Sequence, residues 1–305
     1  MRILVTGGTG FIGPTLIWRL TEMGHHVTVV SRRDQDVIGL PNNVDFVQGD
    51  PTREGEWQEA AAQADAAVNL AGASIFQRWS NKKKKRIQDS RILTTRHLVN
   101  ALTSGGVPGR VLLNASAVGY YGFHGDEKIT EDVPPGRDFL ASVCWEWEKE
   151  AVKAEKSGVR VCCMRFGVVL ESGGGALRQM LPLFKLGIGG RLGSGNQWFS
   201  WIHRADLIEA VLFLLGRDDV RGAFNFTSPH PVTNRELTRE LAGVLHRPAI
   251  LPVPGFAMKI FLGEFADVLL KGQRVVPSRL LDMGFTFSFP NLKQALWNIV
   301  DSAKI

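Results

Sequence analysis

A glycine-rich segment near the start of the chain has the spacing of a phosphate-binding turn. It follows the apolar run 3–5 and precedes a helical pattern. In a strand–turn–helix unit, the first glycine forms the tight turn, the second admits a pyrophosphate and the third packs helix on strand. The free N–H groups at the helix start then bind phosphate oxygens. The residues predicted to contact a dinucleotide here are Gly7, Thr9, Gly10, Phe11, Ile12 and Gly13. A glycine-rich turn without a ligand is the alternative.

The end of the second apolar run indicates which dinucleotide would bind. NAD-selective sites usually place an acidic residue there, which binds the ribose 2′-hydroxyl. This sequence has Ser31, Arg32 and Arg33 instead. A hydroxyl and two guanidinium groups suit a 2′-phosphate, so the sequence predicts NADP(H). Alternatively, the arginines are solvated surface charges.

Short apolar runs that alternate with helical patterns must position these residues. The runs are 3–5, 27–30, 44–47, 66–70, 111–113, 159–164 and 223–227. They predict an α/β fold: a Rossmann-type, doubly wound parallel sheet with a smaller, mostly helical C-terminal substrate lobe. We expect an NADP-binding domain from 1–170, to which 200–228 return, and a substrate lobe from 171–199 and 229–305. The alternating segment 285–289 predicts a further strand.

The sequence resembles the extended short-chain dehydrogenase/reductase superfamily. It is most similar to the epimerase/dehydratase-like "epimerase family" branch, which has a C-terminal domain of unknown function. The resemblance spans nearly the whole chain and depends on the three glycines and on residues 49–50, 69–72, 90–91, 115–122, 147–148, 193–195, 201–203 and 284–290. It implies an NADP(H)-dependent oxidoreductase or epimerase-like enzyme that acts on a hydroxyl or carbonyl of a small substrate, free or nucleotide-linked.

The resemblance also implies further cofactor contacts. Asp50 would contact the adenine, and Arg91 would reach the cofactor from its helix. Alternatively, Asp50 caps a turn and Arg91 is a surface residue. The ribose and phosphates would be lined by Leu70, Ala71 and Gly72, and the nicotinamide end would be flanked by Arg165, Gly167 and Val169.

The catalytic pair of the superfamily is missing. Typical members use a tyrosine and, four residues later, a lysine that lowers the tyrosine pKa. The best-matching register puts Cys144 and Glu148 there, and a slipped register pairs Trp145 with Lys149. Cys144 is either an acid or thiolate, or a small buried helix residue. Glu148 either binds the nicotinamide ribose or lies at the solvent edge.

Other side chains are candidates for the missing chemistry. We expect Ser116 and Tyr121 to hold the reacting oxygen, although the catalytic hydroxyl of the superfamily could align with Ala117. Tyr120 and Tyr121 are the only tyrosines. The predicted substrate-binding residues are Tyr120, Arg191, Trp198, Trp201 and His203. The tryptophans and Arg191 suit a ring-bearing or anionic substrate, or form a seam between lobes.

His203 lies three residues before Asp206, a spacing at which a carboxylate can orient a histidine base. An ordinary buried histidine beside a carboxylate is the alternative. The spacing by itself therefore leaves both readings open.

Composition limits the partners. A net charge of +6 is explained by an anionic cofactor, and the cationic run 82–86 is interpreted as a solvated helix start. We expect no nucleic-acid, membrane or metal partner. Three cysteines form no disulfide framework, which favours the reducing cytoplasm. The expected assembly is a monomer or homodimer. A protein that binds or senses NADP(H) without turnover is the alternative function.

Overall fold

A seven-stranded parallel sheet forms the centre of the computed structural model, which describes residues 1–32, 40–41, 43–105 and 109–302. Its strand order is β3-β2-β1-β4-β5-β7-β11. The strands are β1 (Arg2–Thr6), β2 (His26–Ser31), β3 (Val44–Gln48), β4 (Ala66–Asn69), β5 (Val111–Ala117), β7 (Arg160–Phe166) and β11 (Gly222–Phe226). The order reverses between β1 and β4, as in a doubly wound sheet. The predicted fold class is therefore confirmed.

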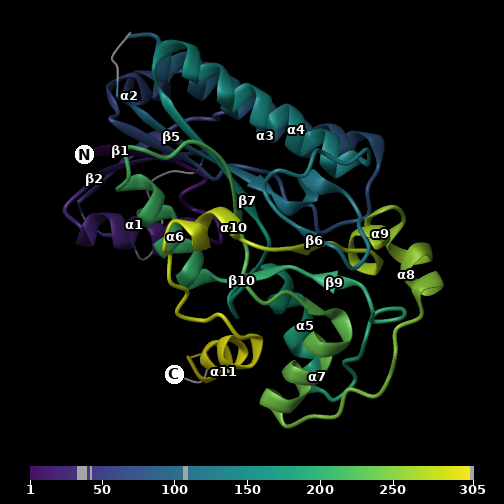
Figure 1. Cartoon of the computed structure of the whole chain (residues 1–305). Coiled ribbons are helices and arrows are strands. Elements are labelled where there is room, and N and C mark those ends of the chain that lie inside the picture. Colours follow the sequence, from purple (N-terminus) through teal and green to yellow (C-terminus); the bar gives the residue numbers. More distant parts are fainter. Residues whose placement is uncertain (33–39, 42, 106–108, 303–305) are drawn as a thin grey trace.

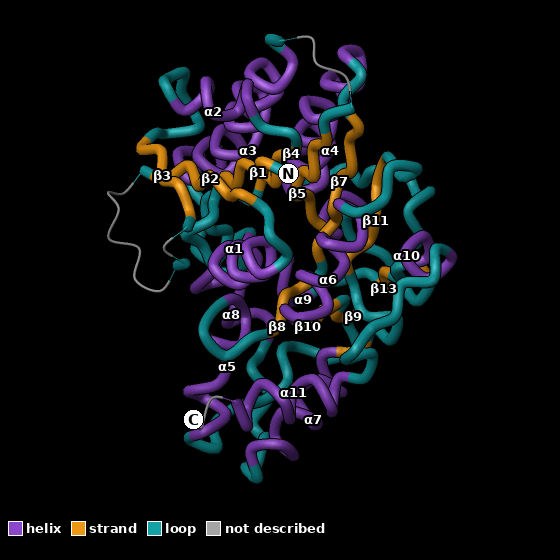
Figure 2. Tube along the Cα trace, turned by 90° about the vertical axis from the view of Figure 1, so that its left-hand side faces the viewer, coloured by secondary structure: helices purple, strands orange, loops and turns teal. Residues whose placement is uncertain are grey.

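Helices cover both faces of this sheet, as Figure 2 shows with the strands nearly edge-on. One face carries α2 (Trp57–Gln63), α3 (Asn81–Thr103) and α4 (Phe139–Val152), and the other carries α1 (Gly13–Glu22) and α6 (Arg204–Leu215). Successive strand side chains point to opposite faces. Thus Val5 packs in the core below α1 and α6, whereas Leu4 packs in the core below α2 to α4.

A second, mostly helical region lies beside the sheet (Figure 1). A separate core joins α5 (Gly175–Lys185), α7 (Asn234–Leu245) and α11 (Leu292–Ser302). Three small sheets connect this region to the large one: β8 (Val168–Leu170) with β10 (Trp201–His203), β9 (Trp198–Phe199) with β12 (Val232–Thr233), and β6 (Lys128–Ile129) with β13 (Arg274–Val275). The remaining elements are η1 (Val118–Tyr121), η2 (Lys153–Ser157), α8 (Gly255–Leu262), α9 (Phe265–Leu270) and α10 (Ser278–Asp282).

The segment 285–289 is not a strand, which corrects the sequence-based expectation. Apolar and polar side chains alternate in this segment because Phe285 and Phe287 pack into the core of the large sheet, and not because its backbone pairs with a strand. The backbone amides of Ser288 and Phe289 donate to the Asp206 carboxylate at 2.8 and 3.0 Å. A side-chain acceptor therefore takes the place of a neighbouring strand.

Within the described part of the chain, no helix combines the length and apolar character needed to cross a bilayer. The same residues hold no cluster of three potential metal ligands. All three cysteines are buried free thiols.

Candidate functional site

The glycine turn between β1 and α1 is enforced by backbone contacts within the protein. Gly7 has a φ of +70°, and a Cβ there would lie 2.7 Å from the backbone of Leu70 and Ala71. A Cβ on Gly13 would lie 2.1 Å from the Gly8 carbonyl oxygen. Only glycine avoids both clashes. The turn is therefore pressed against the end of β4, where Leu70 and Ala71 were predicted to line the cofactor.

The first turn of α1 has no side-chain cap for its backbone N–H groups, and Pro14 in this turn has no N–H group. Ile12 is the N-cap and provides no side-chain hydrogen bond, and the first turn contains no acidic residue. Such a helix end presents unsatisfied donors and a partial positive charge. Thr9 and Gly10 are exposed beside it. Phe11 has a different contact, because its ring packs against Gly174 and Gly175 of the second region. The geometry fits an anion at the turn.

The end of β2 places a cation near this turn. Ser31 is buried and Arg32 is exposed, whereas Arg33 lies outside the described residues. Asp50 accepts hydrogen bonds from the Thr52 amide and hydroxyl at 3.0 and 2.8 Å, so it holds a turn. Burial opposes ionisation of Asp50, but these bonds and the charge of Arg32 outweigh it and lower the Asp50 pKa.

Arg91 on α3 lies over Gly72, at the wall that follows β4. Its Cζ would be 3.2 Å from a Cβ on Gly72, and it donates to the carbonyl oxygens of Ala73 and Ile87. The guanidinium also stacks on the Trp147 ring at 5.3 Å. No described carboxylate forms an ion pair with Arg91, and burial lowers its pKa. A half-buried cation without a counter-ion at this wall suits an anionic ligand.

Ser116, Tyr121, Glu148, Arg165 and Asn225 form a closed hydrogen-bonded group, here called the Glu148 cluster. Ser116 Oγ donates to Glu148 Oε1 at 2.6 Å. Arg165 binds the same carboxylate with two bonds, from Nε to Oε1 at 2.9 Å and from Nη2 to Oε2 at 2.8 Å. Arg165 and Glu148 are only 4% and 9% exposed. Glu148 therefore neutralises a buried cation, and it lies neither at the solvent edge nor free to bind a ribose.

The other half of the cluster fixes Tyr121. Its hydroxyl donates to Asn225 Oδ1 at 2.7 Å and accepts from Arg165 Nη1 at 2.8 Å. Burial raises the Tyr121 pKa to about 12. The Glu148 bonds outweigh desolvation and raise the Arg165 pKa. Ser116 and Tyr121 are 2% and 1% exposed. The structure thus contradicts the expectation that these two hydroxyls face a substrate oxygen, because both already have buried protein partners.

Tyr120 is the more accessible phenol of the loop after β5. It is half-buried, and the Arg165 guanidinium lies 3.5 Å from its ring centre. Burial raises the Tyr120 pKa, although the charge of Arg165 opposes this. The phenol is therefore protonated at neutral pH.

Cys144 lies on the inner side of α4. Burial raises the pKa of its thiol to about 12, which excludes a thiolate at neutral pH. This favours the reading of Cys144 as a small buried helix residue.

The predicted substrate residues separate into two groups. Arg191 and Trp198 are half-buried, with Arg191 Nη1 bonded to the Ser194 carbonyl at 2.7 Å and Trp198 Nε1 bonded to Asp126 at 2.8 Å. Trp201 is fully buried in the helical core. It corrects the expectation of a substrate contact, since a side chain without exposed surface can only pack.

His203 is likewise a structural residue. Its Nδ1 accepts from the Ala205 amide at 3.1 Å, so it caps α6, and its ring packs on Phe289 at 4.0 Å. Burial lowers the His203 pKa to about 4. Asp206 binds the 288–289 backbone instead, so the expected oriented base is not formed.

The remaining predicted residues follow β7. A Cβ on Gly167 would lie 2.7 Å from the Ser200 carbonyl oxygen, so this glycine permits close packing of backbones. Val169 is half-buried and packs on the core of the large sheet. Their predicted proximity to a nicotinamide stays a prediction.

The sequence reasoning assigned no role to three buried asparagines. Asn69 donates to Asn114 Oδ1 at 2.7 Å and accepts from the Thr6 hydroxyl at 2.5 Å, which ties the ends of β1, β4 and β5 together. Asn225 closes the Glu148 cluster on β11. The available signal was an amide side chain inside each otherwise apolar strand, because a buried polar group needs partners.

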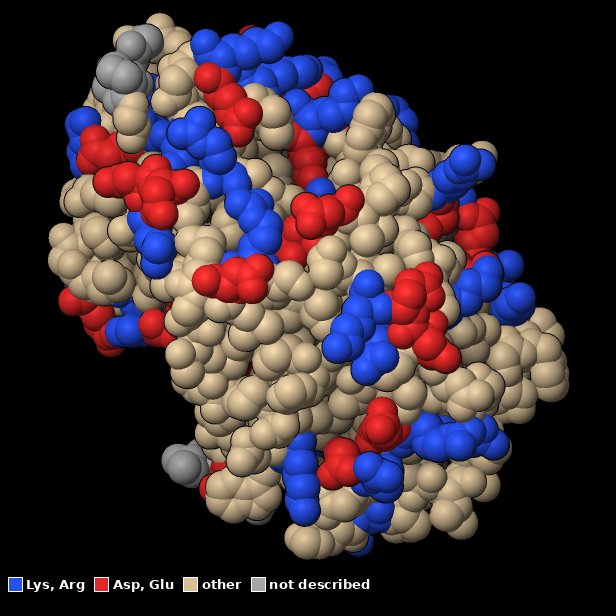
Figure 3. Space-filling view, in the orientation of Figure 1, with Lys and Arg blue, Asp and Glu red and all other residues tan. Residues whose placement is uncertain are grey.

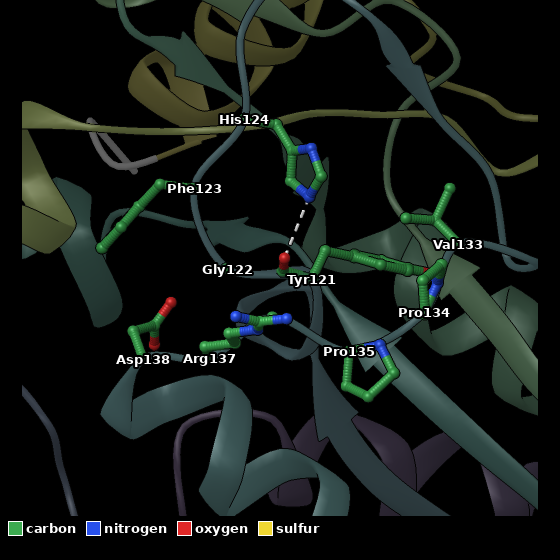
Figure 4. A pocket seen from close by; sticks show the side chains of 10 residues that line it. Tyr121, Gly122, Phe123, His124, Val133, Pro134, Pro135, Arg137 and Asp138 are labelled. Carbon is green, nitrogen blue, oxygen red and sulfur yellow. Dashed lines mark hydrogen bonds between the residues drawn. The ribbon is translucent and has the colours of Figure 1, made fainter.

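A cavity of about 420 Å³ opens behind Tyr121, between η1 and the start of α4 (Figure 4). Its lining includes Phe123, Arg137 and Asp138, and His124 Nε2 lies 3.0 Å from the Tyr121 carbonyl oxygen. A second cavity of about 480 Å³ lies at the amino ends of β1 to β3. Neither lining includes the glycine turn. The predicted binding of a cofactor at the turn, at the carboxyl ends of the strands, therefore stays a prediction.

Comparison with family models matches residues 3–226 to the NAD dependent epimerase/dehydratase family. Residues 253–299 match a domain of unknown function, DUF1731.

Similar proteins cover nearly the whole chain. The chain is 44% identical over 298 residues to the chloroplastic epimerase family protein SDR39U1 homolog of Arabidopsis thaliana, covering 97% of this chain and 86% of that protein. It is 37% identical over 302 residues to the epimerase family protein SAR0825 of Staphylococcus aureus, covering 98% and 99%. The crystal structure of human epimerase family protein SDR39U1 with NADPH matches with a TM-score of 0.87, 37% identity and 99% coverage of both chains. A UDP-glucose 4-epimerase from Thermus thermophilus, at 20% identity and a TM-score of 0.80 over 100% of this chain and 99% of that one, shares the fold.

Proposed function

Because the chain belongs to the NAD dependent epimerase/dehydratase family, we propose that it is an NADP(H)-dependent oxidoreductase or epimerase. Its substrate would be a small molecule, free or nucleotide-linked, that reacts at a hydroxyl or carbonyl. The observation that carries this proposal is the start of α1, which no side chain caps and whose glycine turn packs against the residues that follow β4. NADPH in the crystal structure of the human relative supports the same assignment.

The chain's residues fit a dinucleotide with a third phosphate. The N–H groups of the turn would hold the diphosphate, with Arg91 as the cation of the facing wall. At the end of β2, exposed Arg32 would pair with a ribose 2′-phosphate, and Ser31 beside it is neutral. When bound, the nicotinamide supplies or accepts a hydride.

Proton transfer would fall to Tyr120. The Glu148 cluster supports this phenol, because Glu148 holds Arg165, whose guanidinium lies over the Tyr120 ring. A protonated phenol beside a fixed cation can donate a proton to a carbonyl oxygen and stabilise the negative charge that develops there. Ser116 and Tyr121 would then act as positioning residues that hold Glu148 and Arg165 in place.

The test combines binding with turnover. Calorimetry should show that NADPH binds the wild-type protein more tightly than NADH, and Arg32→Glu should reduce this preference at least tenfold. In a carbonyl panel monitored by NADPH absorbance, Tyr120→Phe should lower kcat at least 100-fold with unchanged NADPH affinity. No NADPH binding by the folded wild-type protein would contradict the proposal.

A non-catalytic NADP(H)-binding or sensing protein is the second candidate. It is favoured by α4, which carries a buried neutral thiol and a paired carboxylate where a tyrosine and a lysine would act. Tight NADPH binding without oxidation against any carbonyl compound, with Tyr120→Phe indistinguishable from wild type, would establish this candidate instead.

We further propose that small molecules, and not nucleic acids, are the ligands. In the cationic run on α3, Lys84 pairs with Glu264 and Lys85 pairs with Asp89, which reduces the charge open to a polyanion. Buried free thiols suit a reducing compartment such as the cytoplasm, and a monomer or homodimer remains the expected assembly.

A further inference from the structure

Large apolar side chains are exposed together around α8. Only Met258 of this eight-residue helix is buried, although nearly all of its residues are apolar. A helix that is apolar all round is normally buried. Six neighbouring side chains are each more than half exposed: Leu186, Ile250, Leu251, Phe256, Ile260 and Phe261. We call them the α8 surface. Exposed patches of this kind mark interaction sites.

Backbone contacts show that this surface is continuous. The segment that follows α5 runs beside the segment that leads into α8. The Val253 amide donates to the Arg191 carbonyl at 2.9 Å, and the Gly193 amide donates to the Val253 carbonyl at 2.9 Å. Gly187 lies against Pro248. Residues 186 and 250–256 therefore share one edge of the molecule.

The charge around the α8 surface has one sign. The segments 172–205 and 241–263 contain no Asp or Glu. Lys185 and Arg247 are exposed there, and no described carboxylate pairs with either. Glu264 and Asp267, which follow α8, already pair with Lys84 and with nearby lysines. In Figure 3 the α8 corner at the right edge is mainly tan, and both blue and red side chains lie next to it.

The exposed apolar side chains and the unpaired cations together indicate what binds the α8 surface. A second copy in a two-fold pair would bring the same cations together without carboxylates to neutralise them. An anionic lipid bilayer complements both features, because phosphate headgroups attract Lys185 and Arg247 while apolar side chains enter the acyl boundary. We propose that the α8 surface docks this protein on anionic membranes. Lying on a bilayer needs no spanning helix. This proposal departs from the sequence-based expectation of no membrane partner, which stays a prediction.

Flotation of the full chain with phosphatidylcholine vesicles, with or without phosphatidylglycerol, tests the proposal. We expect binding only to the anionic vesicles. Phe256→Ser/Phe261→Ser should lower the partition coefficient at least tenfold, since it removes two inserting rings. Lys185→Gln/Arg247→Gln should lower it about tenfold and weaken its salt dependence. Trp297→Ser is the matched control, because it removes an exposed aromatic ring from α11, and should leave binding unchanged.

Circular dichroism and thermal unfolding establish that each variant is folded. No binding of the wild-type protein to anionic vesicles would overturn the proposal, as would equal binding of the double-phenylalanine variant. Light scattering provides a third outcome. A wild-type dimer that Phe256→Ser/Phe261→Ser converts to a monomer, without vesicle binding, would assign the surface to a second copy. NADPH binding, measured in parallel, should be the same in all variants, so the two proposals fail separately.

Discussion

The glycine turn and the Glu148 cluster both lie at the carboxyl ends of the parallel strands, yet they treat their polar groups differently. The turn presents backbone donors at an uncapped helix start. The cluster pairs the buried Ser116 hydroxyl and the Glu148 carboxylate within the protein. A region that binds a ligand must leave polar groups unsatisfied, whereas a region that positions others must satisfy its own. The difference supports the proposal that the turn binds the cofactor and that the cluster positions neighbouring side chains.

The largest expected effect tests whether the cluster is closed. Glu148→Leu leaves the Arg165 charge buried without its partner and should lower the free energy of unfolding by about 3–5 kcal/mol. Urea denaturation measures this. Glu150→Leu, on the same helix, is the matched control. Its partners Arg96 and Lys153 are about half exposed and can return to water, so about 1 kcal/mol or less is expected. If both variants lost the same free energy of unfolding, the Glu148 cluster would not be shielded from solvent.

The next effect tests the openness of the turn. Gly13→Ala places a Cβ against the Gly8 backbone, which should lower NADPH affinity at least 100-fold, about 2.7 kcal/mol. Calorimetry measures the affinity, and thermal unfolding checks the fold. Gly243→Ala is the control, since a Cβ there meets nothing within 4 Å and alanine favours the helix. Unchanged NADPH affinity in Gly13→Ala would remove the turn from the site.

His203 extends the comparison to a second closed position. Its pKa of about 4 lies below the ordinary value near 6.5, so the unfolded chain binds a proton there as pH falls while the folded chain does not. The stabilisation that comes from keeping His203 neutral is complete above about pH 6.5. It is lost as the pH falls towards 4, and the free energy of unfolding is about 2 kcal/mol lower by pH 5. Urea denaturation from pH 7.5 to 5 measures it. His203→Asn keeps a capping side chain and should flatten this slope; the same slope in both proteins would refute the assignment.

The smallest expected effect tests whether Arg91 contributes to NADPH binding at the glycine turn. Arg91→Met keeps the length of the side chain but removes its charge from the wall beside Gly72. NADPH affinity should fall about tenfold, roughly 1.4 kcal/mol, with little change in stability. Arg86→Met removes an exposed cation from the same helix and should leave the affinity unchanged. If Arg86→Met lowered NADPH affinity more than Arg91→Met, only the overall positive potential of this surface would matter for NADPH binding.

Much of the fold could be predicted because its signals are local. The strand-forming runs depend on neighbouring residues, and all seven predicted runs are strands of the large sheet. The segment 285–289 was misread because alternation reports which side chains are buried, not which backbone groups pair. Its amides bind Asp206, about 80 positions earlier in the chain, which no local pattern contains.

The sequence by itself determined the family, the parallel sheet and the location of the glycine turn, because spacing within a few residues dictates backbone shape. Only the tertiary structure decided which polar groups stay open. Ser116, Glu148 and Arg165 come from three different elements, and their pairing depends on how β5, α4 and β7 pack. Partners that are far away in sequence decide whether a side chain is free to react or holds other side chains in place. Burial makes it costly to break these pairs.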